Sequence, residues 1–313
     1  MPFLLMLLLG AGLLAQQPEK QDEIPIFRAG VTLIKVDVEV TGRDQKNIAD
    51  FTQQDFRVFD EDQPQEIAHF EKQSEPLDLL LLLDVSGSMR KSLEEVAAST
   101  RASLAQLHEG DRVALMLFSR RAEVVQPFTT DLRNTQNRIL DSIYKQNLGA
   151  GTLINESLIA AADYIKQQPA KGRRAIVIVT DNEGLNYKSP DSEVVKAMLG
   201  ADTVLNAIVV RKPPKPAPVR VNAYTNPDFA PPDVYRIAAD TGGEAVDGAG
   251  KVSPMFQRVI ERIRARYFLQ YPAPPSGSGA FRKIRVELTP AARQRHPGAV
   301  IRARAGYYPN SEQ

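Results

Sequence analysis

The central part of the chain alternates between short apolar runs and longer segments with a helical period. Uninterrupted apolar runs such as LLLLLD at 79–84 and RAIVIVT at 174–180 are typical of strands buried on both faces, because a half-exposed strand would alternate apolar and polar residues. Between these runs, apolar residues recur every three or four positions, as on one face of a helix. The segments with this period are 92–107, 131–146, 155–167, 191–199 and 253–266. Strands that alternate with helices predict an α/β fold with a doubly wound, mainly parallel sheet.

The two ends of the chain show the other pattern, in which apolar and charged residues alternate. This period of two is typical of antiparallel strands with one face in water, and it occurs at 34–40, 281–288 and 299–306. The segment FRVFDEDQPQEIAHF at 56–70 predicts a hairpin around a polar turn. Because an apolar strand face cannot be buried alone, we expect strands from both ends to pair in one small antiparallel β-sandwich.

These patterns divide the chain into four parts. We expect a signal peptide over 1–15, N-terminal strands of the β-sandwich over 24–75, an inserted α/β domain over 76–266 and C-terminal strands of the sandwich over 267–309. The first apolar stretch is too short to span a bilayer comfortably and ends in small residues, as signal peptides do. The sequence therefore predicts an exported protein, located in the periplasm, on the cell surface or in the medium. Because no basic residue precedes the apolar stretch, an uncleaved N-terminal anchor is the alternative; no other membrane-spanning segment is expected.

Composition and charge exclude several kinds of site. The chain has no cysteine, which excludes disulfides, thiolate metal sites and a catalytic thiol. Its formal net charge of +1 does not favour nucleic acid as a partner. One local basic patch stands out near the last predicted helix, made of Arg258, Arg262, Arg264 and Arg266. We expect these arginines to form a solvated face and predict no nucleic-acid partner.

Oxygen-bearing side chains gather where the buried strands end. Asp84, Ser86 and Ser88 follow the leucine run at alternate positions, so their side chains point the same way on an extended loop. Asp181 ends a second buried strand, and Thr152 lies in the glycine-containing loop NLGAGTLINESL. Ligands of open parallel sheets bind at this edge, and oxygen-only donors suit Mg²⁺, Mn²⁺ or Ca²⁺. The alternative is that Asp84 merely caps the following helix while the serines bond loop amides.

The motifs DVSGS, GAGT and VIVTD together resemble the metal-ion-dependent adhesion site of von Willebrand factor A-type domains, which is written D-x-S-x-S followed by a distant threonine and a distant aspartate. The resemblance covers 76–266. It implies that Ser86 and Ser88 ligate a divalent cation, most commonly Mg²⁺, directly. It also implies that Thr152 binds directly or through water, and that Asp84 and Asp181 bind largely through water. One coordination position would remain for an Asp or Glu carboxylate of a protein partner.

The flanks extend the resemblance to exported bacterial members of this superfamily, a group best represented in acidobacteria. The segments that carry this likeness are DFTQQDFRVFDEDQPQEIAHF before the central domain and RARAGYYP at the end. One departure from the family pattern is Asn182, where many members have glycine after the aspartate. We therefore expect the turn at this position to differ while the carboxylate of Asp181 is unaffected.

Two enzyme classes compete for the same stretch. A Mg²⁺-dependent phosphatase of the haloacid dehalogenase type would use Asp84 as nucleophile, but its first motif needs a second aspartate where Ser86 stands. The segment SMRK at 88–91 matches the S-x-x-K of penicillin-binding enzymes, yet no K-T-G follows. The three histidines are scattered and none lies near these motifs. The sequence thus predicts a non-catalytic binding protein without catalytic residues, and the phosphatase remains the alternative.

Overall fold

The structure is a computed structural model that describes residues 32–72, 76–145, 147–184, 189–210, 233–247, 252–275 and 279–309. The signal peptide predicted over 1–15 lies outside the described residues. Within the described ranges, no helix combines the length and the apolar character that crossing a bilayer requires.

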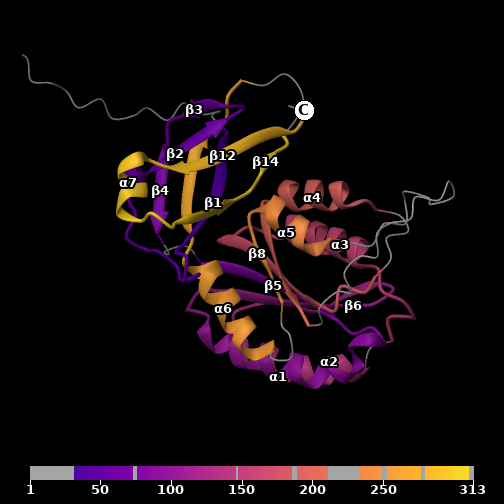
Figure 1. The fold of residues 1–313 in the computed structure, drawn as a ribbon. Coiled ribbons are helices and arrows are strands. Elements are labelled where there is room, and N and C mark those ends of the chain that lie inside the picture. The colour runs from indigo at the N-terminus through magenta and orange to yellow at the C-terminus, as the bar shows by residue number, and fades with distance from the viewer. Residues whose placement is uncertain are drawn as a thin grey trace, which may run out of the picture. The chain divides into compact units, whose positions relative to one another are not determined.

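A six-stranded sheet lies at the centre of the α/β part (Figure 1). Its strands, in spatial order, are β10 (Ala245–Asp247), β9 (Thr203–Val209), β8 (Arg173–Thr180), β5 (Leu77–Asp84), β6 (Arg112–Phe118) and β7 (Ala122–Thr129). All neighbours run parallel except β6 and β7. The predicted α/β fold with a mainly parallel sheet is confirmed. The sequence pattern does not predict β7, because this edge strand is partly exposed along most of its length and lacks a continuous apolar run.

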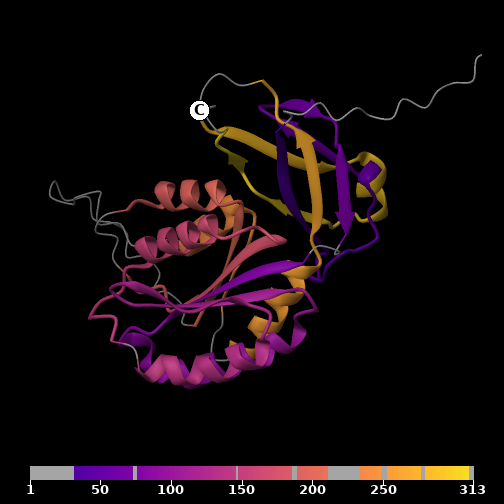
Figure 2. The same ribbon diagram turned by 180° about the vertical axis from the view of Figure 1, so that it is seen from behind.

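Helices cover both faces of the sheet, and the same two helix layers are seen from behind (Figure 2). One face carries α1 (Leu93–Ser103), α2 (Leu132–Lys145) and α6 (Val252–Arg264), and the other carries α3 (Ile154–Gln167), α4 (Asp191–Gly200) and α5 (Val234–Thr241). The helix predicted over 92–107 is shorter than expected, because α1 gives way to the 3₁₀ turn η3 (Leu104–Gln106). The arrangement is the doubly wound one that the alternation of strands and helices predicts.

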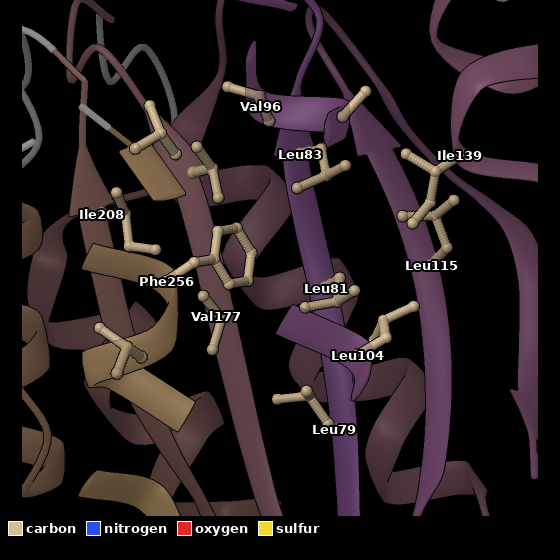
Figure 3. Close-up of a cluster of buried hydrophobic side chains, with 14 of the residues drawn as sticks. Leu79, Leu81, Leu83, Val96, Leu104, Leu115, Ile139, Val177, Ile208 and Phe256 are labelled. Carbon is tan, nitrogen blue, oxygen red and sulfur yellow. The ribbon is translucent and has the colours of Figure 1, made fainter. Parts of the chain in front are cut away.

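The leucine run of β5 is completely buried. Successive side chains of a strand point to opposite faces, so Leu79, Leu81 and Leu83 pack in the core beneath α1, α2 and α6 (Figure 3). Leu80 and Leu82 pack in the core on the other face. Burying one leucine side chain stabilises a protein by about 1.5–3 kcal/mol. Packing on both faces therefore anchors β5 and, with it, the loop at its carboxyl end.

The two ends of the chain form two small antiparallel sheets that share one core. The first has the order β13 (Val300–Ala303), β1 (Leu33–Thr41), β11 (Tyr267–Pro272) and β4 (His69–Lys72), and the second β14 (Gly306–Tyr307), β12 (Arg282–Leu288), β2 (Phe56–Asp60) and β3 (Gln63–Gln65). Short helical turns, η1 (Gln53–Asp55) and α7 (Pro290–Arg295), accompany these sheets. Each sheet combines strands from both ends, so the predicted pairing of the flanks is confirmed. The boundaries of the four predicted parts stay a prediction.

The arginines at the end of α6 do not form the solvated face that the sequence pattern indicates. Arg262 is 2%, Arg264 9% and Arg266 2% exposed. Arg262 and Arg266 form ion pairs with Glu39 of β1, and Arg264 pairs with Asp111. The prediction of a solvated face is wrong, because the acidic partners lie on segments far away in the sequence, where helical periodicity cannot reveal them.

Candidate metal-binding site

Asp84 is the last residue of β5, and its side chain is fully buried. The Ser86 backbone N–H donates to Asp84 Oδ1 at 2.9 Å, and the Thr180 hydroxyl donates to Asp84 Oδ2 at 2.7 Å. β5 and β8 are parallel neighbours, so their carboxyl ends meet at one edge of the sheet. Both oxygens of Asp84 are therefore held in place by residues of this edge.

The two serine hydroxyls converge, but not on the extended loop that the alternate spacing predicts, because Gly87 between them is helical with a φ of -60° and a ψ of -34°. Ser86 Oγ and Ser88 Oγ are 3.1 Å apart. Both serines lie within a tight turn, in which the Met89 N–H donates to the Ser86 carbonyl at 3.1 Å as the 3₁₀ turn η2 (Ser88–Lys91) begins. Ser86 is buried and Ser88 is partly exposed, so the Ser88 hydroxyl lies nearer to solvent than the Ser86 hydroxyl that it contacts.

Asp181 follows β8 and is also fully buried. The Glu183 backbone N–H donates to Asp181 Oδ1 at 3.0 Å, whereas Oδ2 is buried and has no hydrogen-bond partner among the described residues. Asn182 has a left-handed φ of 57°, and its N–H donates to Thr180 Oγ1 at 3.1 Å. Asparagine adopts this conformation more readily than most residues. This explains how asparagine can stand where glycine is usual.

The loop that carries Thr152 is held by a serine of the neighbouring strand end. Ser119 Oγ donates to the carbonyl oxygens of Gly149 and Gly151, each at 2.8 Å. These glycines have φ values of 87° and 104°, which other residues rarely adopt. On its other side the loop meets Gly184, where an added Cβ would lie 3.2 Å from the Thr152 carbonyl oxygen. Thr152 thus lies between the end of β6 and the loop after β8.

The five predicted site residues, Asp84, Ser86, Ser88, Thr152 and Asp181, all lie at the carboxyl edge of the sheet. Hydrogen bonds join Asp84 to Ser86 and Ser86 to Ser88. Asp181 interacts electrostatically with Asp84, and Thr152 occupies the adjacent loop. Their role as metal ligands stays a prediction.

The pKa of Asp84 is raised from 3.8 to about 6. Burial is the main cause, because it disfavours the charged carboxylate, and the negative charge of Asp181 adds to the effect. Hydrogen bonds from Ser86 and Thr180 favour the carboxylate and oppose this rise in pKa. The site therefore holds a carboxylate at neutral pH against a penalty that a nearby cation would remove.

Asp84 and Asp181 differ from the other buried acids in the described part of the chain. Six other buried carboxylates each form an ion pair with an arginine; they are Glu39, Asp55, Asp60, Asp78, Asp111 and Glu244. Among the described residues, no ion pair is recorded for Asp84 or Asp181. Because buried charges are normally paired or bound to a metal, these two carboxylates lack the compensation that the other six have.

The donor set fits a hard divalent cation. It combines carboxylate and hydroxyl oxygens, which suit Mg²⁺, Mn²⁺ and Ca²⁺, and the unpaired Asp181 Oδ2 is available to bind a cation or its water. In the described ranges, no cluster of three or more His, Asp or Glu side chains is arranged to hold a metal. A cation here would therefore depend on the hydroxyls of Ser86, Ser88 and Thr152 as well as on the two carboxylates.

Two residues of the site are absent from the sequence prediction. Thr180 donates to Asp84, and Ser119 fixes the Thr152 loop. Each directly follows the last apolar residue of a buried strand, Val179 or Phe118. A search for hydroxyls at every strand end, rather than for ligands alone, would have found both.

A sequence comparison finds one domain family over the segment that contains these residues. Residues 79–184 match the von Willebrand factor type A domain. This matched segment contains all five predicted site residues and covers about a third of the chain. Von Willebrand factor A-type domains commonly bind divalent cations and mediate protein binding.

Individual proteins are similar over parts of the chain. An uncharacterized protein of Borreliella burgdorferi is 29% identical over 138 residues, which are 42% of this chain and 40% of that protein. Two solved structures from Bacteroides are also similar. An aerotolerance-related membrane protein of Bacteroides fragilis is 20% identical with a TM-score of 0.46, over 60% of this chain and 98% of that one. The protein BatB of Bacteroides thetaiotaomicron is 21% identical with a TM-score of 0.46, over 60% of this chain and 97% of that one.

Proposed function

We propose that this chain is an exported, non-catalytic binding protein whose von Willebrand factor A-type domain holds a divalent cation. The cation, Mg²⁺ before Mn²⁺ or Ca²⁺, would be bound by Asp84, Ser86, Ser88, Thr152 and Asp181. The observation that carries the proposal is the pair of fully buried carboxylates, Asp84 and Asp181, for which the described part of the chain records no cationic partner. A divalent ion would supply the missing charge.

The partner would bind through an acidic side chain. A cation held partly by neutral hydroxyls keeps much of its positive charge, so an anionic oxygen gains most by replacing a bound water. A protein surface offers such an oxygen as Asp or Glu. The chain's own groups would hold and orient the cation, while the partner would complete its coordination.

The phosphatase alternative gains no support from the geometry. Asp84 is fully buried, and both its oxygens accept hydrogen bonds, so it is poorly placed to attack a substrate. The histidines lie elsewhere, in β4, after η3 and after α7. We expect no hydrolysis of p-nitrophenyl phosphate with Mg²⁺ present; turnover that disappears in Asp84→Asn would favour the phosphatase instead.

Metal binding is tested by thermal unfolding in EDTA and in excess Mg²⁺ or Mn²⁺. A ligand that binds only the folded state at a hundredfold excess over Kd stabilises it by about 2.7 kcal/mol, so Tm should rise. Ser86→Ala should lose this rise. Ser103→Ala is the matched control, because Ser103 is a buried serine with a single hydrogen bond, to the Ser99 carbonyl, outside the site. Equal Tm values with EDTA and metal would contradict the proposal.

Export is tested by cell fractionation. The apolar start of the chain motivates the expectation that the mature protein lacks 1–15 and is found outside the cytosol. Mass spectrometry of the fractions identifies the N-terminus. A cytosolic full-length chain would show that this part of the proposal is wrong.

A further inference from the structure

Basic residues lie on two adjacent loops next to the candidate metal site. The loop after β5 carries Arg90 and Lys91, and the loop after β6 carries Arg120 and Arg121. These loops lie side by side, because the Val85 N–H at the end of β5 donates to the Phe118 carbonyl at the end of β6 at 2.9 Å. All four basic residues are exposed, and none belongs to an ion pair recorded for the described part of the chain.

Two of these side chains are tied to the loop that carries Thr152. The stem of Arg120 lies against Gly149, where an added Cβ would be 3.2 Å from Arg120 Cβ. Arg121 Nη2 donates to the Asn147 carbonyl oxygen at 2.7 Å. The stem of Arg120 and the guanidinium of Arg121 are therefore held against the loop that carries Thr152.

The arginines beside the site differ from the arginines at the end of α6. Arg262 and Arg264 are buried and paired with acids, so their charges are used within the fold. For the four cations at the loops, no ion pair with an acid is recorded among the described residues. With a divalent ion bound between them, this edge of the sheet would carry more positive than negative charge around one open coordination position, even when Asp84, Asp181, Glu156 and the exposed Glu183 are counted.

We propose that the partner presents an acidic segment rather than a single carboxylate. One Asp or Glu would complete the cation's coordination, and the acidic residues next to it would pair with Arg90 and Arg120. This inference rests on the proposed function, because the metal defines where the first carboxylate binds. Arg90 and Arg120 would then determine specificity, by favouring a run of acidic residues over an isolated one.

A protein segment fits this edge better than a single-stranded nucleic acid does. Proteins that bind single strands stack bases on exposed aromatic side chains. In the described part of the chain, the exposed large hydrophobic residues are Phe281 and Val300, and both lie outside the α/β part. Among the described residues, the charge beside the site thus has no exposed aromatic platform, and an acidic peptide needs none.

The test uses the full chain and three fluorescent peptides of equal length in a Gly/Ser background. One has a single Asp, one has that Asp flanked by two Glu residues, and one has it flanked by two Lys residues. Affinities are measured in Mg²⁺ at low and high salt, and in EDTA. The charge variant is Arg90→Gln combined with Arg120→Met, which keeps an unbranched stem against Gly149. Arg120→Lys keeps the charge, and Arg293→Gln, at an exposed position of α7, is the matched control.

We expect the Glu-flanked peptide to bind roughly four- to twenty-five-fold more tightly than the single-Asp peptide at low salt, since each exposed pair contributes about two- to five-fold. High salt and the double variant should remove this difference, while Arg120→Lys and Arg293→Gln should keep it. Mn²⁺ binding by the double variant, measured by calorimetry, should be as tight as in the wild type.

Two outcomes would overturn the inference and leave the proposed function intact. These are equal Mg²⁺-dependent binding of the single-Asp and Glu-flanked peptides, or a double variant that still discriminates between them. A third outcome would also overturn the inference, in favour of nucleic acid. It is displacement of the Glu-flanked peptide by a single-stranded oligonucleotide that, counted per negative charge, is present at a lower concentration than the peptide. If EDTA leaves all peptide binding unchanged, the proposed function itself fails.

Discussion

Replacing Asp84 by Asn should stabilise the metal-free protein at neutral pH, although Asp84 is a central residue of the site. The buried carboxylate has a pKa raised from 3.8 to about 6, so the folded state disfavours its charged form. Asparagine has nearly the same shape and can still accept the hydrogen bond from the Ser86 N–H. Its amide can also donate to the Thr180 hydroxyl, which reverses that bond without breaking it.

The magnitude follows from proton linkage. Between pH 3.8 and about 6 the folded state holds the Asp84 proton more tightly than the unfolded state does, so stability falls as pH rises through this window. One pH unit corresponds to about 1.4 kcal/mol, so the full penalty above pH 7 is about 3 kcal/mol. Asp84→Asn should remove it. In EDTA the variant should gain up to about 3 kcal/mol at pH 7.5 and nothing below pH 4.

The assay is urea unfolding of both proteins at several pH values, in EDTA and in excess Mg²⁺. In Mg²⁺ the wild type should be the more stable protein, because it gains free energy from metal binding that Asp84→Asn has lost. Asp78→Asn is the matched control: Asp78 lies in the same strand but pairs with Arg112, so this change should destabilise the protein at pH 7.5 with or without metal.

The opposite result would refute the reasoning. If Asp84→Asn is less stable than the wild type in EDTA at pH 7.5, the carboxylate is already compensated within the fold. The same conclusion would follow from a difference between the two proteins that does not change between pH 4 and pH 7.

Two further predictions concern residues that support the fold and the site. Glu39→Gln should destabilise the protein by about 3–5 kcal/mol in urea unfolding, because Arg262, Arg266 and Arg302 around it would lose their carboxylate. The control Arg285→Gln, which removes an exposed ion pair with Asp62, should change stability far less, and equal effects of the two substitutions would contradict this. Ser119→Ala should lower the free energy of unfolding by about 1–3 kcal/mol, because two carbonyls of the Thr152 loop lose their donor. The variant should also bind Mg²⁺ more weakly in calorimetry. Unchanged Mg²⁺ affinity would show that the loop holds its position without Ser119.

Much of the fold could be read from local patterns. The leucine run predicts a strand buried on both faces, and β5 is such a strand. The spacing of Asp84, Ser86 and Ser88 predicts converging oxygens, and the two serine hydroxyls do converge. The first prediction succeeds because the direction of a side chain depends on the backbone period of its own segment, which neighbouring residues reveal. The second gives the right contact for another reason, because Gly87 has helical φ and ψ values and the two serines meet in a turn.

The tertiary structure decides what each side chain meets. The period of α6 places its arginines on one face, but only the position of β1 shows that the buried Arg262 and Arg266 form ion pairs with Glu39. In the same way, the contact of Thr180 with Asp84 depends on the parallel register of β8 and β5. Sequence patterns report which face of an element is apolar, whereas charge pairing depends on segments that meet only after the chain has folded. The sequence alone thus determined the sheet interior and the donors of the candidate site. The tertiary structure decided which buried charges are paired, as Glu39 and Asp111 are, and which have no ion pair recorded among the described residues, as with Asp84 and Asp181.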